Sequence, residues 1–343
     1  MVKIRSGLMV ALLALLAACG GDSGANQPAE VIVYSARNEH LIKPLFDRFT
    51  EETGIAVRYV TDDAGPLLTR LQAEGVNSPA DLLMTVDAGN LWQAAEAGML
   101  RPVQAPALEA EVPAHLRDPQ GRWFALTIRA RTMVYSTERV QPEALSTYEA
   151  LADPAWRGRL CLRTAKKVYN QSLVATMIAA LGAEQTEQIV RGWVDNLAVP
   201  PFANDTLVME AIAAGQCDVG LVNTYYYGRL KRERPELPVA IFWPNQSGEG
   251  VAARGVHVNV SGAGVTRYSR NPEAAIRLLT WLAAPEAQRM LVALNQEYAV
   301  NAAVEMTPEM AAWGAFRGDD IHVGEAGRLQ VEAVKLMDRA GYQ

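Results

Sequence analysis

The sequence predicts an α/β protein that folds as two lobes with a ligand cleft between them. Apolar strand patterns alternate with amphipathic helix patterns along most of the 343 residues, which is typical of α/β domains with a mostly parallel sheet. A chain of this length, half of it apolar, is expected to form roughly two domains, each with its own core. The alternation falls into two series, and two lobes joined by crossing strands would enclose a cleft that a hinge motion can close.

The N-terminal segment predicts export from the cytoplasm. Residues 1–18 carry Lys3 and Arg5 and then an apolar run too short for a permanent transmembrane helix, as in a signal peptide. The end of this run, "LAAC", resembles a bacterial lipoprotein box, so we expect Cys19 to become the lipid-modified first residue of the mature chain. Residues 19–29 would then be a lipidated, flexible tether rich in Gly, Ser, Asn and Pro. The alternative is a plain signal peptide that is cut nearby.

The first series of elements ends near residue 100. The run "VIVYS" predicts a strand, and "LIKPLFDRFTEETG" predicts an amphipathic helix that Gly54 closes. Strand, helix, strand and helix then follow at residues 55–60, 66–75, 80–86 and 88–100.

The second series begins near residue 132. Its expected elements are strand, strand, helix, helix and strand at residues 132–137, 159–164, 170–182, 205–216 and 217–223. After a further strand near residues 256–266 come two helices, 272–283 and 285–295, whose apolar faces would suit the first lobe.

These patterns divide the mature chain into three segments. We expect residues 30–127 to form the first part of the N-terminal lobe and residues 128–256 the C-terminal lobe. Residues 257–343 would return to the N-terminal lobe and add the C-terminal helices.

Three consecutive tyrosines, Tyr225, Tyr226 and Tyr227, follow a short apolar run in "GLVNTYYYGRL". Neighbouring side chains of a strand point to opposite faces, so Tyr225 and Tyr226 could share one target only at a turn. The run "VGLV" fits a buried strand and "YYGRLKRER" fits the start of a helix. The tyrosines are therefore expected outside the carboxyl end of a strand, where α/β proteins place their ligands.

The cysteines predict one disulfide. With Cys19 assigned to lipid, Cys161 and Cys217 remain as an even pair in an exported, oxidising compartment. Tyr169 follows Cys161 by eight residues, and Tyr225 follows Cys217 by the same interval. A bridge between neighbouring strands would bring these two tyrosines to one cleft, whereas a pair of free, buried thiols is the alternative.

Composition and motifs argue against several functions. A net charge of −6 without a basic run argues against a nucleic-acid partner. The sequence has no G-x-S-x-G elbow, Walker phosphate loop, dinucleotide glycine fingerprint or H-E-x-x-H, and its four histidines lack metal-ligand spacing. We therefore expect no enzyme, although Glu39 beside His40 leaves a degenerate enzyme of this fold as an alternative.

The clustered phenols indicate the kind of ligand. A phenol has a pKa near 10, so it binds divalent ions poorly at neutral pH, whereas a hard trivalent cation can deprotonate it. Several tyrosinates in one cleft therefore favour Fe(III) over zinc or copper. Aromatic packing and stacking on an organic ligand remain alternatives at this point.

From "VIVYSARNEHLIKPLFDRFTEETGI" to "LNQEYAVN", nearly all of the mature chain resembles the bacterial periplasmic ferric-iron-binding proteins. The landmarks are "YSARNEHLIKPLF", "SPADLLMTVDAG", "RARTMVYS", "KVYNQSLVA", "NDTLVMEAIAAGQCDVGLVNTYYYGRL" and "HVNVSGAGVT". This family comprises substrate-binding components of iron ABC transporters with a transferrin-like, class II periplasmic-binding-protein fold. The resemblance implies a periplasmic protein that captures Fe(III) and delivers it to an inner-membrane permease with its ATPase. Together with the lipid expected on Cys19, this predicts a protein anchored to the membrane, and we expect it to be a monomer.

The resemblance also implies a ligand set. The tandem tyrosines bind iron in this family, which carries over to Tyr225 and Tyr226, and the tyrosine of "YNQS" carries over to Tyr169 as a third ligand. The first loop departs from the pattern, because Asn38 and Glu39 stand where many relatives have histidine, or histidine and tyrosine. The remaining candidates for a further metal ligand are Glu39, His40 and Asp87.

The implied branch of the family uses three tyrosines and a synergistic anion, usually carbonate. Three phenolates neutralise Fe(III), and a small bidentate oxyanion would fill the open coordination positions. The residues that match family positions near the anion are Arg37, Arg129, Arg131, Asn204 and Asn223. Guanidinium groups suit an oxyanion, although each arginine could instead pair with a surface acid.

One other binding function remains open from the residues alone. A two-lobed receptor could bind a polyamine, thiamine or an oxyanion in place of iron. A polyamine site would contain several carboxylates in the cleft, where this sequence has clustered phenols and arginines.

Overall fold

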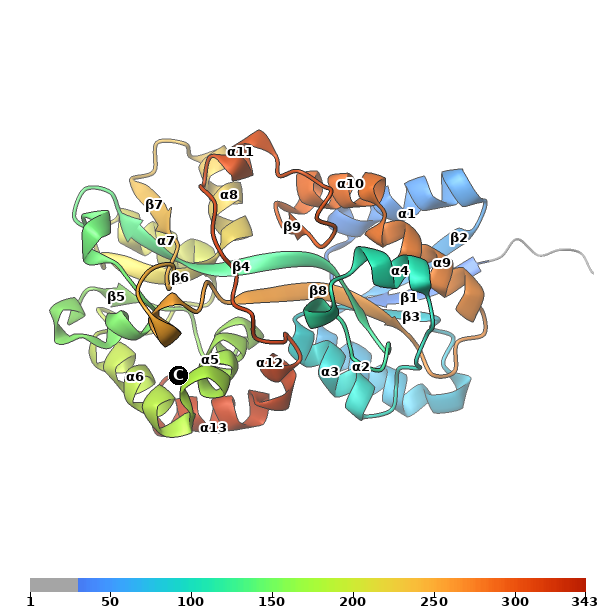
Figure 1. Cartoon of the computed structure of the whole chain (residues 1–343), viewed down its shortest axis with the longest axis horizontal. Coiled ribbons are helices and arrows are strands. Elements are labelled where there is room, and N and C mark those ends of the chain that lie inside the picture. Colours follow the sequence, from blue (N-terminus) through green and yellow to red (C-terminus); the bar gives the residue numbers. More distant parts are fainter. Residues whose placement is uncertain (1–29) are drawn as a thin grey trace, which may run out of the picture.

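The computed structural model describes residues 30–343, which fold as two lobes side by side (Figure 1). The signal peptide, the tether and the lipidation of Cys19 lie outside the described residues and stay predictions. Within residues 30–343, every helix is too short or too polar to cross a bilayer.

The first lobe is built on a sheet with helices on both faces. Its strands are β1 (Glu30–Ser35), β2 (Ala56–Thr61), β3 (Leu82–Val86), β8 (Val258–Val265) and the first half of β4 (Phe124–Ser136). Its helices are α1 (Glu39–Thr53), α2 (Ala64–Glu74), α3 (Ala88–Glu96), α4 (Pro106–Glu111), α9 (Pro272–Ala283) and α10 (Pro285–Asn295). The last two match the predicted bounds, because Pro at the first turn marks each start.

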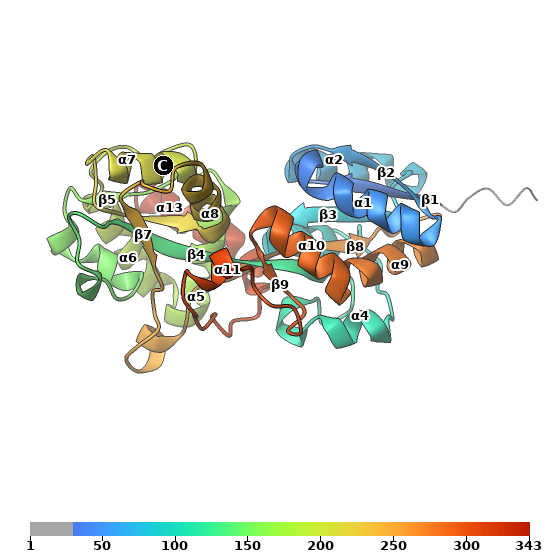
Figure 2. The same cartoon turned by 90° about the horizontal axis from the view of Figure 1, so that it is seen from above.

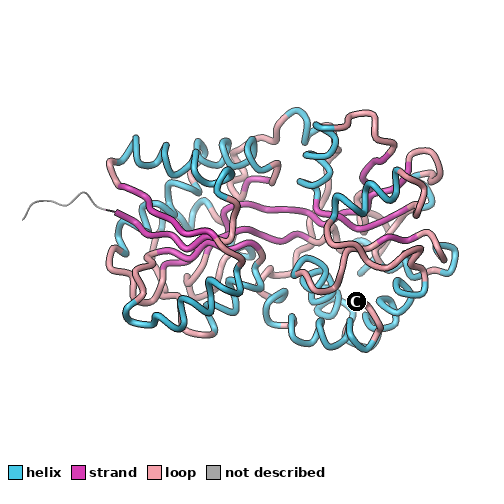
Figure 3. Tube along the Cα trace, turned by 180° about the vertical axis from the view of Figure 1, so that it is seen from behind, coloured by secondary structure: helices cyan, strands magenta, loops and turns pink. Residues whose placement is uncertain are grey.

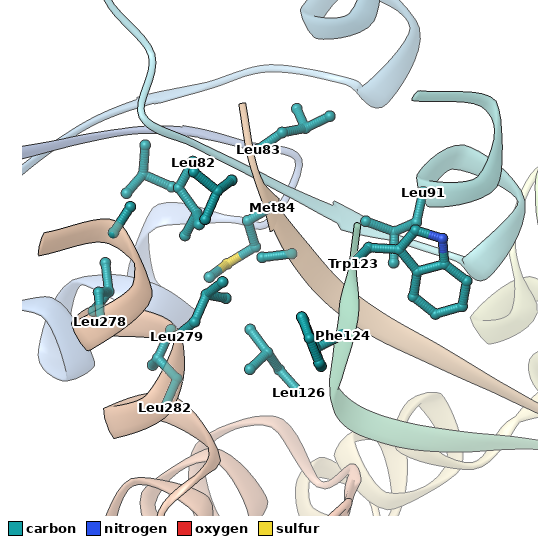
Figure 4. Close-up of a cluster of buried hydrophobic side chains, with 14 of the residues drawn as sticks. Leu82, Leu83, Met84, Leu91, Trp123, Phe124, Leu126, Leu278, Leu279 and Leu282 are labelled. Carbon is teal, nitrogen blue, oxygen red and sulfur yellow. The ribbon is translucent and has the colours of Figure 1, made fainter. Parts of the chain in front are cut away.

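Local sequence explains how these elements begin and end. Helix α1 buries Leu41, Leu45 and Phe49 on one face, and Gly54 ends it in the left-handed conformation (φ 71°) that glycine adopts without strain. In the core, Leu82 and Met84 of β3 pack with Phe124 and Leu279 from distant parts of the chain (Figure 4).

Two long strands join the lobes. Strand β4 (Phe124–Ser136) pairs through Phe124–Ala130 with β8 (Val258–Val265) of the first lobe and through Arg131–Tyr135 with β6 of the second. Figure 1 shows β4 and β8 running side by side between the lobes. The strand was expected only from residue 132, because the two arginines of "TIRART" interrupt the apolar run.

The second lobe has its own sheet and helices. Its strands are the second half of β4, β5 (Leu160–Cys161), β6 (Val219–Asn223) and β7 (Val239–Phe242). Its helices include α5 (Val168–Leu181), α6 (Ala183–Asp195), α7 (Asp205–Ala213) and α8 (Thr224–Glu233). A core that includes Leu173, Trp193 and Leu221 holds them together.

The expectation of a mostly parallel sheet is wrong. Strands β1, β2 and β3 are parallel to one another, as are β5 and β6, but β8 is antiparallel to both β3 and β4. Strand β4 is also antiparallel to β6 and β7. The crossing strands reverse direction because the chain leaves the first lobe on β4 and returns to it on β8.

The C-terminal segment connects both lobes. It contains β9 (Tyr298–Ala299), which pairs with β4, then α11 (Pro308–Ala311), α12 (Glu325–Arg328) and α13 (Gln330–Arg339). Figure 2 shows α11 next to α8, and Figure 3 shows helices on both faces of the strands in each lobe. Helix α12 contacts α3 and α5, and α13 packs on α5 and α6 of the second lobe.

Short 3-10 helices complete the secondary structure. They are residues Gly75–Asn77, Ala114–Leu116, Pro142–Ala144, Glu149–Ala152, Pro154–Trp156 and Gly250–Ala253. The predicted α/β architecture of two lobes is confirmed, and the boundaries of the three chain segments stay predictions.

Candidate metal centre

The tandem tyrosines lie at the carboxyl end of β6. All five residues of β6 are buried, and α8 begins directly after Asn223, so Tyr225 and Tyr226 occupy the first turn of the helix. Their ring centroids are 4.5 Å apart. The predicted strand-to-helix turn is therefore confirmed, and it allows the side chains of two consecutive tyrosines to lie next to each other.

A disulfide brings the third tyrosine to this turn. Cys161 on β5 is bonded to Cys217, just before β6, and the two strands are parallel neighbours. The predicted disulfide is confirmed. Tyr169 lies in the first turn of α5, close enough to Tyr225 that a charge on one phenol raises the pKa of the other.

Burial dominates the electrostatics of the phenols. Only 6% of Tyr225 is exposed, and burial raises its pKa well above the ordinary value of 10, with a further increase from charge on Tyr169 and Tyr226. Burial also raises the pKa of Tyr169, while the charge of Arg129 opposes this increase. Burial therefore favours the protonated forms of Tyr169 and Tyr225, and a cation that binds these two phenols must displace their protons.

Arg163 is a functional candidate that the sequence analysis missed. It is buried, and its guanidinium carbon lies 4.7 Å from the ring centroid of Tyr169 and 5.9 Å from that of Tyr226. It follows Cys161 by two residues at the carboxyl end of β5. Its place beyond the end of a strand next to the predicted disulfide could have identified it.

A buried carboxylate, Asp205, organises the residues behind the phenols. It lies 3.2 Å from Arg131 and 3.3 Å from Arg163, and it accepts a hydrogen bond from the backbone N–H of Asn223 at 2.8 Å. Two guanidinium groups thus share one carboxylate, which leaves positive charge in excess beside the phenols. Asp205 starts α7, but no motif in the sequence singled it out.

Arg131 is held by structural partners. Besides Asp205, it donates hydrogen bonds to the side chains of Asn170 and Asn223 and to the carbonyl of Leu221. Asn223 in turn donates from Nδ2 to the hydroxyl of Tyr225 at 3.3 Å. Arg131 and Asn223 therefore support the tyrosines from behind, and their predicted contact with an anion stays a prediction.

Arg129 faces the phenols from the crossing strand β4. Its guanidinium carbon lies 5.3 Å from the ring centroid of Tyr169, and its Nη1 donates to the Ser261 hydroxyl at 3.0 Å. Within residues 30–343, the buried Nη2 has no hydrogen-bond partner. This atom lies 3.6 Å from Oδ2 of Asp87, so it forms an ion pair there and could also donate a hydrogen bond to an added oxyanion.

Arg37 belongs to the first lobe. It pairs with Glu297 at 3.0 Å, donates to Asn295 at 2.8 Å, and shares the Ser261 hydroxyl with Arg129. Arg37 and Arg129 are therefore linked through the Ser261 hydroxyl, which accepts a hydrogen bond from each of them. Glu297 is a further charged residue that the sequence pattern did not indicate.

Asp87 lies at the junction of the lobes in a fully buried position. Its carboxylate accepts hydrogen bonds from Gly89 at 2.9 Å, from Ser172 of α5 at 2.8 Å and from Asn259 at 2.8 Å. Burial raises its pKa, while Arg129 opposes the increase. Its φ of 81° is strained for a residue with a side chain. Metal ligation by Asp87 would require breaking these hydrogen bonds.

The remaining predicted residues are more exposed. Glu39 and His40 lie exposed at the start of α1, where Glu39 accepts a hydrogen bond from the Tyr59 hydroxyl at 2.9 Å. Asn204 caps α7 by accepting from the backbone N–H of Leu207 at 3.0 Å. The structure thus brings Tyr169, Tyr225, Tyr226, Arg129 and Asn223 together, whereas Glu39 contacts Tyr59, His40 is exposed and Asn204 caps α7.

The donor set restricts the possible metal. Among residues 30–343, His, Cys, Asp and Glu form no group of three that could hold an ion. The three phenols supply a different kind of donor, because phenolate oxygens are hard and suit Fe(III).

Comparisons with known proteins agree with this donor chemistry. The family model described as bacterial extracellular solute-binding protein matches residues 44–318. Iron uptake protein A1 of Synechocystis sp. is 42% identical over 96% of this chain and 93% of its own length. A Trichodesmium protein solved in complex with iron and citrate ligands is 42% identical, with a TM-score of 0.87 over 92% of this chain and all of its own.

A more distant structure shows the same architecture. The ferric iron-binding protein A of Mannheimia haemolytica, solved in an open conformation, is 34% identical with a TM-score of 0.84, covering 92% of this chain and 99% of its own. The predicted resemblance is confirmed. The chain belongs to the bacterial extracellular solute-binding proteins, among the relatives of iron uptake and ferric-iron-binding proteins.

Proposed function

We propose that this protein binds Fe(III) through the phenolates of Tyr169, Tyr225 and Tyr226 and hands it to an ABC permease. The observation that carries this proposal is the convergence of three phenols from α5 and α8, with Arg129 and Arg163 against their rings. The relatives named for iron uptake supply the second line of support.

Charge balance extends the proposal to an anion. Three phenolates cancel the charge of Fe(III), and the excess positive charge of Arg131 and Arg163 over Asp205 remains. A small oxyanion such as carbonate would offset this charge, complete the coordination and accept a hydrogen bond from Nη2 of Arg129, which has an ion-pair contact with Asp87 but no hydrogen-bond partner among residues 30–343. Arg37, Asn204 and Asn223 remain proposed as further anion contacts, and Glu39, His40 and Asp87 as possible fourth ligands.

The physiological role follows from the family and the N-terminus. We infer a monomeric periplasmic protein, held at the membrane by lipid on Cys19, that serves a permease and its ATPase and catalyses no reaction. Protonation of the phenolates, reduction to Fe(II) or loss of the anion would each weaken binding and favour release.

The test is the visible spectrum of the mature protein during titration with Fe(III)–citrate in bicarbonate. We expect an orange-to-red tyrosinate charge-transfer band that saturates at one iron per chain and is lost in Tyr226→Phe. A colourless protein would contradict the proposal and favour an organic solute. A band of equal intensity with and without bicarbonate or citrate would contradict the synergistic anion.

A further inference from the structure

The helix that carries the tandem tyrosines is held by a segment that comes from the first lobe. This segment, residues 296–316, is called the strap here. It leaves α10, pairs with β4 through β9, and reaches α8 through α11 (Figure 2). It therefore connects the tyrosine-bearing turn to the opposite lobe.

The contact centres on Gly228, two residues after Tyr226. A Cβ atom at this position would lie 2.7 Å from Cζ2 of Trp313 and 2.8 Å from Oε1 of Gln296. Gly228 lies in the interior of α8, where glycine is less favourable than alanine by about 0.5–1 kcal/mol. Close packing against the strap, and not backbone conformation, thus explains the glycine.

Contacts on both sides of the strap fix the position of Trp313 and α8. The carbonyl of Trp313 accepts a hydrogen bond from Nε1 of Trp243 at 2.9 Å. The ring centroid of Trp313 lies 5.9 Å from that of Tyr227. Glu309 pairs with Arg232 on α8 at 2.6 Å and accepts from Gln296 at 3.0 Å. The strap therefore contacts α8 at two successive turns.

We propose that Trp313, acting through Gly228, is a positioning residue for the phenol groups of Tyr225 and Tyr226. This inference rests on the proposed function. Restoring an ordinary carbon–carbon separation after adding a methyl group at Gly228 requires a shift of about 1 Å. Because α8 begins with the tyrosines, such a shift moves their phenolates relative to Tyr169. Misplacement on this scale weakens a metal site without removing a ligand.

The experiment compares two glycine variants of the mature protein. Gly228→Ala is expected to weaken Fe(III) binding about 10- to 100-fold and to shift the charge-transfer band. The matched control is Gly192→Ala in α6, where a Cβ would lie 2.5 Å from Cβ of Ala152. This control is equally crowded but lies away from α8, so it should lower stability and leave affinity and band unchanged.

A second substitution tests whether the effect passes through Trp313. Trp313→Leu in the Gly228→Ala background opens space for the added methyl group and should restore the wild-type band and most of the affinity. If Gly228→Ala does not fold, Trp313→Ala takes its place, with an expected loss of about tenfold in affinity.

The outcomes separate this inference from the proposed function. A wild-type protein without an iron band refutes the iron site itself. A normal wild-type band with identical behaviour of Gly228→Ala and Gly192→Ala refutes positioning by the strap. Failure of Trp313→Leu to restore the band, or unchanged affinity in Trp313→Ala, refutes the role of Trp313.

Discussion

The two lobes differ in how their buried charges are balanced. In the first lobe, Arg37 and Glu297 form a one-to-one pair, and nearby Asn295 and Ser261 accept hydrogen bonds from Arg37. In the second lobe, two arginines share Asp205 beside three phenols. A balanced pair has little to gain from an added anion, whereas surplus positive charge favours one, and the phenols can exchange their protons for a trivalent metal. We therefore infer that the second lobe is the primary binding surface and that the first lobe covers it.

The largest expected effect contrasts one proposed ligand from each lobe. Tyr226→Phe removes a phenolate oxygen and is expected to lower Fe(III) affinity at least about 10,000-fold, or about 5.6 kcal/mol. Glu39→Gln, from the first lobe, should change affinity far less. Isothermal or spectroscopic titration against a competing chelator measures both, and equal losses would contradict the assignment of primary binding to the second lobe. A circular dichroism melt checks that both variants are folded.

A matched pair of buried carboxylates gives the next effect. Asp205→Asn and Glu297→Gln each leave buried guanidinium charge without its partner, so each should lower the free energy of unfolding by about 3 to 5 kcal/mol. Only Asp205→Asn should also weaken iron binding, because Asp205 holds Arg163 against Tyr169. Chemical denaturation and iron titration of both variants separate the effects. If iron binding were weakened in Glu297→Gln and not in Asp205→Asn, the first lobe and not the second would be the primary binding surface.

The disulfide is confined to the second lobe and offers a third contrast. Replacing Cys161 and Cys217 by Ala removes a cross-link between positions 56 residues apart. The free energy of unfolding should fall by about 2 to 4 kcal/mol, and the iron band should broaden because β5 and β6 are less firmly aligned. Calorimetry with and without iron provides the measurement. Unchanged stability would show that the core alone aligns these strands.

The smallest effect concerns the junction of the lobes. Burial, with Arg131, Arg254 and Arg129 nearby, lowers the pKa of His257 from 6.5 to about 3. Between these pH values the unfolded chain binds more protons than the folded one, so stability falls as pH falls below 6.5. The loss from this group is about 2 kcal/mol at pH 5.

The variant His257→Gln isolates this effect. It should show a smaller decrease in melting temperature between pH 7 and pH 5 than the wild-type protein. If the melting temperature fell equally in both proteins, the sensitivity to acid would come from titratable groups other than His257.

The features that follow from local sequence could be predicted. The turn before Tyr225, the disulfide, and the bounds of α9 and α10 each depend on neighbouring residues or on a simple count of cysteines. The antiparallel crossing of β8 could not be predicted, because strand direction depends on where the chain re-enters the sheet.

The proposed ligands of the site could be predicted from the sequence, but the buried residues that hold them in place could not. Tyr169 and the tandem tyrosines stand out by type and spacing. Arg163 and Asp205 do not, because their role depends on contacts between residues 42 positions apart. The contact of Gly228 with Trp313 joins residues even farther apart in the sequence and becomes visible only in the packed structure.

The position of β8 also determines the order in which the molecule can fold. This strand lies between β3 and β4 in the sheet, yet it is made only after β4, β5, β6 and β7 of the second lobe. The N-terminal third of the chain therefore cannot complete its hydrophobic core until β8 has been synthesised. The core of the second lobe in turn includes Leu336 and Met337 of α13, which follows β8 in the chain. Both cores depend on contacts between distant segments, which slows folding. Neither lobe can become fully native before the last part of the chain has been translated.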